Sequence, residues 1–259
     1  MSEPNTYGKL YLCGTPIGNL EDITFRAIRI LKEVDFIACE DTRHTIKLLN
    51  HFEIKTKMIS YHQHNEEKSS EYIINNLIEG KNIALVSDAG MPIISDPGSL
   101  VVKKSIENNI TLVPVPGPSA FLMSLVVSGF DTTSFSYYGF LPHKNKDQNE
   151  IWEKMRFSQN VSVIYESPHR LLNTLNDIKN NLGEVNLCIC REITKKYEEF
   201  FRGDINKSIQ YFSENTIKGE FCIVIDKISN NIVNDTNSIE LEIDKLILEK
   251  VSTKDISSP

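Results

Sequence analysis

Four acidic side chains could take a proton from a hydroxyl group or hold such a group in place. Glu40, Asp41, Glu166 and Glu192 each lie one or two residues after a short apolar run. A carboxylate at such a position is a candidate general base. The sequence does not rank the four, and Asp41 is equally well explained as the residue that caps a following helix.

Basic side chains in the same loops, and in the loop near residue 143, could hold phosphate groups. A guanidinium group binds a phosphate through parallel hydrogen bonds, and other basic groups add positive charge. Neighbouring charges of opposite sign also form solvated ion pairs without any function, so both interpretations stand. The candidate phosphate contacts are Arg43, His143, Lys144, His169, Arg170, Arg191 and Lys195.

Residues 87–98 hold two Ser-Asp pairs, two prolines and two glycines in one loop. Small residues let backbone donors and acceptors approach a bound molecule closely. Asp88 offers a carboxylate to an ammonium group or a ribose hydroxyl. Ser95 or Asp96 is expected to cap a helix that begins at Pro97. The rest of the loop favours a cofactor site over a structural turn.

Other common sites lack their signatures. Residues 14–18 match neither the glycine pattern of dinucleotide-binding loops nor a phosphate-binding loop. His62 and His64 could lie on one side of a strand, but no third ligand follows at the spacing of a metal site, so no metal is expected. The five cysteines form no Cys-x-x-Cys pair, and we interpret them as reduced core residues.

Short β-rich runs alternate with helical patterns along the chain. Such repetition predicts βα units and a largely parallel sheet, which binds ligands at the carboxyl edge of its strands. After Gly129 the pattern restarts, and a helix is predicted from Pro168 to Leu182, ended by Gly183. The predicted strands are residues 9–13, 36–39, 83–86, 111–115, 135–140, 161–165, 187–190 and 221–225.

We therefore expect an α/β fold of two lobes, each with a mixed or mostly parallel sheet flanked by helices. The predicted division places an N-terminal lobe at residues 1–129 and a C-terminal lobe at residues 130–228. A polar linker and a short, incomplete helical tail are expected over residues 229–259.

Composition limits the possible classes of protein. The 259 residues include 28 basic and 35 acidic ones, a net charge of −7, with 40% hydrophobic residues. This content supports a packed core and excludes a disordered or collagen-like chain. No apolar run approaches the roughly 18 residues that span a bilayer, and no signal sequence opens the chain, so we expect a cytoplasmic protein without a membrane partner. The acidic balance argues against indiscriminate nucleic-acid binding.

Seven segments, taken in order, resemble the motifs of one family. They are residues 14–20, 40–43, 87–98, 116–120, 166–170, 191–195 (Arg191, Glu192, Thr194 and Lys195) and 218–220. The family is that of the bacterial small-subunit ribosomal RNA methyltransferases I, which have the tetrapyrrole methylase fold. The resemblance covers about residues 8–226. Met91 departs from it, since the family more often has Thr there.

The resemblance implies a two-lobed enzyme that binds S-adenosylmethionine (SAM) in a cleft between its lobes. It implies 2′-O-methylation of a cytidine ribose in the decoding region of 16S rRNA, presented on the small ribosomal subunit, by a homodimer. The implied cofactor contacts are Pro16, Ser87, Asp88, Gly90, Pro92, Ile93, Ser119, Ala120, Tyr165, Lys218 and Gly219.

Two alternatives are kept. The protein could be a SAM-dependent methyltransferase of the same fold that acts on a small molecule such as a tetrapyrrole. It could also be a catalytically inactive ribosome assembly factor that retains the cleft as a binding module.

Overall fold

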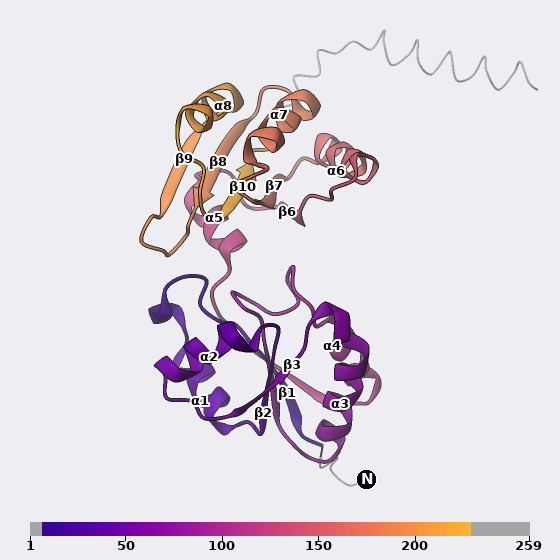
Figure 1. Ribbon diagram of the computed structural model, residues 1–259. Coiled ribbons are helices and arrows are strands. Elements are labelled where there is room, and N and C mark those ends of the chain that lie inside the picture. Colours follow the sequence, from indigo (N-terminus) through magenta and orange to yellow (C-terminus); the bar gives the residue numbers. More distant parts are fainter. Residues whose placement is uncertain (1–6, 229–259) are drawn as a thin grey trace, which may run out of the picture. The chain divides into compact units, whose positions relative to one another are not determined.

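The computed structural model describes residues 7–228, which form two five-stranded sheets (Figure 1). The first sheet holds β1 (Lys9–Cys13), β2 (Phe36–Cys39), β3 (Lys57–Ser60), β4 (Ile83–Val86) and β5 (Thr111–Val115). The second holds β6 (Phe135–Phe140), β7 (Val161–Glu166), β8 (Asn186–Arg191), β9 (Glu199–Asp204) and β10 (Phe221–Ile225). The predicted linker and tail at residues 229–259 lie outside the described residues.

Helices connect the strands in both sheets. They are α1 (Phe25–Glu33), α2 (Thr42–His51), α3 (Glu66–Ile78), α4 (Ser99–Glu107), α5 (Ala120–Ser128), α6 (Asn145–Phe157), α7 (Leu171–Leu182) and α8 (Ile205–Glu214), with short 3-10 turns η1 (Leu20–Asp22) and η2 (Gln63–Asn65). Within the described part of the chain, no helix has both the length and the apolar character needed to cross a membrane.

The first sheet is parallel throughout, in the order β3-β2-β4-β1-β5. Along β4, Ala84 and Val86 pack in a core with α1 and α2, whereas Ile83 and Leu85 pack in a second core with α3 and α4. Alternate side chains of a strand point to opposite faces, so both faces of this sheet are covered. All five strands therefore end on one common edge.

The second sheet is mixed, in the order β6-β7-β10-β8-β9. β6 and β7 are parallel, while β10 runs antiparallel to both β7 and β8. Helix α5 packs through Leu125 on the face that carries Cys188, Cys190 and Cys222. This reversed direction brings the first residues of β10 beside the last residues of β7 and β8.

Several predicted elements differ from the structure. The helix expected from Pro168 begins at Leu171, because residues 168–170 form a turn. The helix expected from Pro97 begins at Ser99, and its cap is Gly98 with φ 138°, so neither Ser95 nor Asp96 caps it. Strands β3 and β9 were not predicted, because their short runs are only partly buried.

The sequence left open that His62 and His64 lie on one side of a strand, and in the structure they do not. His62 is the cap of the 3-10 turn η2, and the two rings meet edge to face with centroids 6.1 Å apart. Among residues 7–228, no group of three or more His, Cys, Asp or Glu side chains could hold a metal ion.

The division of the chain at residue 130 stays a prediction. Helix α5 ends at Ser128, and Gly129 adopts a left-handed conformation with φ 81° before β6 begins in the second sheet. Residues 7–227 nevertheless belong to one compact unit.

The loops that follow β1 and β5 touch backbone to backbone. A Cβ atom on Gly14 would lie 2.7 Å from the Cα atom of Gly117 and 2.7 Å from the sulfur of Met91. We expect Gly14→Ala to lower the free energy of unfolding by about 1–3 kcal/mol, because the added methyl group cannot be accommodated without backbone movement. Urea unfolding measures this change.

Gly203→Ala is the matched control. A Cβ atom at Gly203 would meet its nearest neighbour, an edge atom of the Phe201 ring, at 3.2 Å. The control should lose much less stability, and equal losses in both variants would contradict the packing argument.

Candidate functional site

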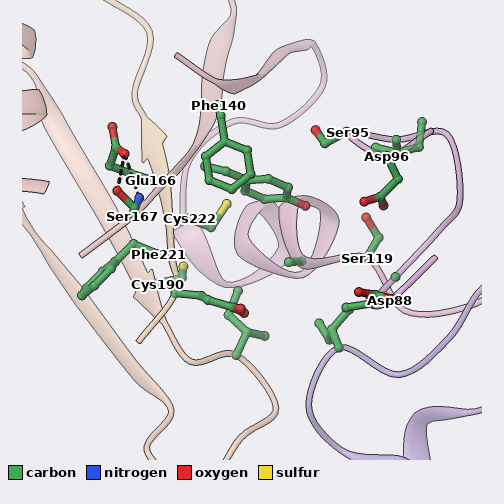
Figure 2. Close-up of a pocket in the computed structure, with 18 of the residues that line it drawn as sticks. Asp88, Ser95, Asp96, Ser119, Phe140, Glu166, Ser167, Cys190, Phe221 and Cys222 are labelled. Atoms are coloured by element: carbon green, nitrogen blue, oxygen red, sulfur yellow. Dashed lines mark hydrogen bonds between the residues drawn. The ribbon is translucent and has the colours of Figure 1, made fainter. Parts of the chain in front are cut away.

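A cavity of about 360 Å³ lies where the carboxyl ends of strands from both sheets meet (Figure 2). The loops after β1, β4 and β5 supply residues such as Ile17, Asp88 and Ser119. The ends of β6, β7 and β8, with the start of β10, supply residues such as Tyr165 and Phe221. Pockets of this size that combine apolar walls with a few polar groups are typical ligand sites.

Backbone hydrogen bonds fix the turn after β4 against the loop after β1. Thr15 and Gly90 donate their N–H groups to each other's carbonyl oxygens, at 2.9 and 3.0 Å. The hydroxyl of Thr15 also donates to the carbonyl of Ser87 at 3.1 Å. Gly90 has φ 82°, a conformation that favours glycine. The turn thus holds Asp88 in the cavity wall.

The next loop is strained and is held from two sides. Ile93 and Ser95 have φ values of 78° and 66°, which non-glycine residues rarely adopt, least of all β-branched ones. The Ser95 hydroxyl lies 2.7 Å from the Tyr137 hydroxyl on β6, and the Gly98 N–H group donates to a carboxylate of α3 at 3.1 Å. As a result, Asp96 lines the cavity.

Aromatic side chains form the opposite wall. The Tyr165 hydroxyl accepts a hydrogen bond from the N–H group of Phe121 on α5, at 3.1 Å. Its ring meets those of Tyr137 and Phe140 edge to face, with centroids 5.3 and 5.5 Å apart. Burial raises the pKa of Tyr165 far above its usual value, so the phenol stays neutral. This wall offers flat apolar surface to a ligand.

Lys195 reaches from the second sheet to the loop after β1. Its ammonium group lies 3.0 Å from Glu192 Oε1 and 2.8 Å from Glu220 Oε2. A Cβ atom on Gly18 would lie 2.2 Å from the Lys195 Cγ atom, so the lysine stem packs directly on the Gly18 backbone. Lys195 therefore closes one side of the cavity.

Glu166 is buried and its carboxylate is fully engaged. Oε1 accepts the N–H group of Ser167 at 2.7 Å, Oε2 accepts the Thr174 hydroxyl at 2.6 Å, and Arg170 Nε lies 3.6 Å from Oε1. Figure 2 shows Glu166 turned toward Ser167, on the far side of the cavity from Asp88. These bonds explain why the chain turns at residues 168–170 before α7 begins.

Glu192 is bound to the loop that precedes β10. Its Oε1 atom accepts the N–H group of Glu220 at 2.9 Å, and Glu192 itself has φ 50°. Burial raises the pKa of this carboxyl, but the hydrogen bonds from Glu220 and Lys195 outweigh burial and leave the pKa below its usual value. Glu192 does not line the cavity.

Asp41 caps α2, as one interpretation of the sequence predicted. Its Oδ1 atom accepts the Arg43 N–H group at 2.8 Å, and the Arg43 guanidinium donates to Oδ1 at 3.1 Å and to Oδ2 at 2.8 Å. These hydrogen bonds lower the pKa of Asp41 to about 2. A carboxylate with so low a pKa is a weak base at neutral pH.

Three other carboxylates share the edge of the first sheet. Burial raises the pKa of Asp96 to about 6, and the charges of Glu40 and Asp88 act in the same direction. Burial also raises the pKa of Glu40, again with a contribution from Asp88. Asp88 accepts the N–H group of Asp41 at 3.1 Å. Mutual repulsion between these acids favours holding a proton or a cation among them.

The cavity contains some of the expected cofactor residues and excludes others. Those that line it are Asp88, Gly90, Ser119, Ala120 and Tyr165. Those that lie outside its wall are Pro16, Ser87, Pro92, Ile93, Lys218 and Gly219. Most of the second group support the wall: the Ser87 hydroxyl donates to the carbonyls of its own turn, and Lys218 accepts a hydrogen bond from Arg191 at 2.6 Å.

The expected RNA contacts divide in the same way. Arg43, His143, Lys144 and His169 are exposed. Arg170 instead donates to the carbonyl of Leu141 at 3.0 Å, and so holds the loop before His143. Arg191 and Lys195 pair with Glu199 and with the two acids described above.

Sequence reasoning missed several lining residues. Asp96 was interpreted as a helix cap, and Phe140, Cys190 and Cys222 were assigned only to strands. The clue for Asp96 was its place in the loop at residues 87–98, which carries more polar and small residues than a cap needs. Nothing in the sequence showed that Phe221 and Cys222 at the start of β10 would reach the cavity, since this depends on strand direction.

Comparison with known proteins identifies the fold and the family. Residues 9–208 match the family model described as "Tetrapyrrole (Corrin/Porphyrin) Methylases". Solved structures with the same fold include a diphthine synthase (TM-score 0.68, 11% identity, covering 85% of this chain and 90% of that one) and a cobalt precorrin-4 methyltransferase (TM-score 0.65, 13% identity, 87% and 98%). A uroporphyrin-III C-methyltransferase from Thermus thermophilus was solved with S-adenosylhomocysteine (TM-score 0.59, 15% identity, 85% and 98%).

Curated relatives are closer in sequence. The chain is 52% identical over 219 residues to a protein of Halalkalibacterium halodurans, covering 85% of this chain and 76% of the relative. It is 49% identical over 228 residues to one of Bacillus subtilis, covering 88% and 78%. Both relatives are named "Ribosomal RNA small subunit methyltransferase I". The chain therefore belongs to the tetrapyrrole methylase family, in the branch whose curated members carry that name.

Proposed function

We propose that the protein transfers a methyl group from SAM to the 2′-hydroxyl of a cytidine in the decoding region of 16S rRNA, on the assembled small ribosomal subunit. The observation that carries the proposal is that six of the seven motif segments contribute residues to one cavity, residues 40–43 being the exception. The name shared by relatives at 49% and 52% identity supports ribosomal RNA as the acceptor. Because ribosomes are cytoplasmic, the proposal includes a cytoplasmic location.

The cavity suits a molecule with a cationic end and a flat ring, as SAM has. The Asp88 carboxylate can accept hydrogen bonds from an ammonium group or from ribose hydroxyls. Gly90 and Ala120 leave room for close approach to the backbone, and Tyr165 and Phe140 offer apolar faces for an adenine ring. When bound, SAM supplies an electrophilic methyl group on sulfur.

The cofactor candidates that do not line the cavity are proposed to hold the lining residues in position. Pro16 and Ser87 hold the two loops joined by the Thr15 and Gly90 backbone bonds. Pro92 and Ile93 shape the strained loop that carries Asp96. Lys218 and Gly219 pack on Arg191 and Glu192, and so fix the position of Lys195.

The exposed basic groups are the proposed RNA contacts. His143, Lys144 and His169 lie after β6 and β7, two strands that reach the cavity, and Arg43 lies in the first turn of α2. A few such contacts let an acidic protein bind a folded RNA particle by shape. Arg170, Arg191 and Lys195 are engaged within the protein, and we assign them to holding these loops in place.

The protein is also proposed to act as a homodimer. Helix α5 exposes Leu122, Met123 and Val126, and Val126 is 71% exposed. Contiguous apolar residues on a surface helix are typical of protein interfaces.

The proposed reaction predicts one specific product. Incubation of the protein and SAM with small subunits that lack 2′-O-methylation in the decoding region should yield 2′-O-methylcytidine, which mass spectrometry of the digested RNA detects. Methylation of a tetrapyrrole precursor instead would favour the small-molecule alternative. Affinity for small subunits without any methyl transfer would favour the assembly factor.

Cofactor binding predicts a role for Asp88. Asp88→Asn should weaken SAM binding by about 10-fold to 100-fold, since a hydrogen bond to a charged group contributes roughly 1.5–3 kcal/mol. Isothermal calorimetry measures the change. Asp177→Asn makes the same chemical change on α7, away from the cavity, and should leave the affinity unaltered. Equal affinities in all three proteins would remove Asp88 from the site.

A further inference from the structure

We propose that Asp96 is the catalytic base: its carboxylate takes the proton of the ribose hydroxyl that attacks the methyl group. This inference rests on the proposed function and adds to it a residue that was expected only to cap a helix. It follows from where the carboxylate lies, what holds the loop around it, and what occupies the other acids of the site.

The other acids are engaged elsewhere. Glu166 is buried under hydrogen bonds from Ser167 and Thr174, and Asp41 is paired with Arg43. Glu192 accepts bonds from the backbone and from Lys195, and it lies outside the cavity wall. A carboxylate that is saturated with donors has little capacity to accept another proton.

Asp96 lines the cavity and has fewer donors than these acids: a hydrogen bond with the Ser87 side chain lowers its pKa, but this effect is smaller than the opposite effects of burial and of the neighbouring charges. Figure 2 shows its carboxylate on the same side of the cavity as Ser119 and Asp88, with no hydrogen bond drawn to the other residues shown. Asp88 lines the same wall, but it already accepts the N–H group of Asp41. Asp96 is therefore the cavity acid best able to receive a proton from a bound hydroxyl group.

The backbone around Asp96 is built to hold it there. Ser95 has φ 66° and Gly98 has φ 138°, and the contacts of Ser95 with Tyr137 and of Gly98 with α3 anchor the loop on both sides. Backbone conformations of this kind persist only when surrounding contacts impose them, and they occur often at functional sites. A helix cap does not need a strained backbone before it, so the conformation of Ser95 is not explained by the start of α4.

The charges that face Asp96 suit the role. Glu40 after β2 and Asp88 after β4 are both acidic, Tyr137 faces it from β6, and Lys195 on the opposite wall is paired with Glu192 and Glu220. Burial and the two negative charges outweigh the hydrogen bond with the Ser87 side chain and bring the pKa of Asp96 to about 6. A base with this pKa is ionised at pH 7 yet accepts a proton more readily than an ordinary aspartate.

The chemical step balances without a further reagent. The ribose oxygen forms a bond to the methyl carbon while the carbon–sulfur bond of the sulfonium breaks and its electron pair stays on sulfur. The hydroxyl proton passes to the Asp96 carboxylate, which later releases it to water. The products are a ribose methyl ether and a thioether, and both are neutral at the reacting atoms.

The test measures methyl transfer to unmethylated small subunits by Asp96→Asn, with Asp177→Asn as the matched control. Asp96→Asn should lower kcat by about 100-fold or more, the range that general-base catalysis usually supplies. SAM affinity by calorimetry should change by less than about threefold, which shows that the variant is folded and that the cofactor site is intact.

The pH dependence separates a base from a structural residue. In the wild type kcat should fall about tenfold per pH unit below pH 6, because the base must be unprotonated, and this limb should vanish in Asp96→Asn. Asp96→Glu restores a carboxylate and should recover both part of the rate and the acid limb.

Each opposite result overturns the inference. A rate for Asp96→Asn within threefold of the wild type, or an unchanged acid limb, would exclude Asp96 as the base. A loss of SAM affinity beyond tenfold would assign Asp96 to cofactor binding. If the wild type methylates no small subunit, the proposed function fails together with this inference, whereas an active wild type with an active variant defeats the inference alone.

Discussion

The architecture of the site depends on the close approach of the three loops that follow β4, β1 and β5, which are neighbouring strands of the parallel sheet. β1 lies between β4 and β5, and its loop bonds to the turn after β4 through Thr15 and Gly90. On the other side, Gly14 touches Gly117 with no room for a side chain. Because the backbones themselves are in contact, the loops cannot move apart independently, and each polar group that they carry has a fixed position relative to the others.

This arrangement explains why similar carboxylates have different chemistry. Glu166 is the last residue of β7 and Asp41 lies two residues after β2, and at both places backbone and side-chain donors saturate the carboxylate. Asp96 lies farther along a loop that bends away from its strand, so no helix start supplies it with donors. Asp41 and Asp96, two residues of the same type, thus receive different pKa values from local hydrogen bonding, burial and charge.

The strand pattern of the sequence predicted much of the fold. Alternation of apolar runs with helices is a local property, and the runs at residues 9–13, 36–39, 83–86 and 111–115 match β1, β2, β4 and β5. The loops after three of these strands, β1, β4 and β5, line the cavity, and the ligand site expected at this edge stays a prediction. The start of α7 was predicted wrongly because Ser167 and Pro168 satisfy local capping rules, whereas the buried Glu166 carboxylate binds the Ser167 N–H group instead. The burial of Glu166 and the antiparallel direction of β10 depend on how the whole chain packs, so they cannot be deduced from local patterns.

Two cysteine thiols in the cavity wall raise the question of how readily they react with oxidants. Cys190 and Cys222 lie opposite each other on β8 and β10, belong to the core of the second sheet, and line the cavity. Burial raises the pKa of Cys222 to about 12, so its reactive thiolate form is scarce at neutral pH. Peroxides and electrophiles that enter the cavity therefore meet an unreactive thiol. The same apolar packing that builds the sheet thus keeps the Cys222 thiol protonated and slow to oxidise.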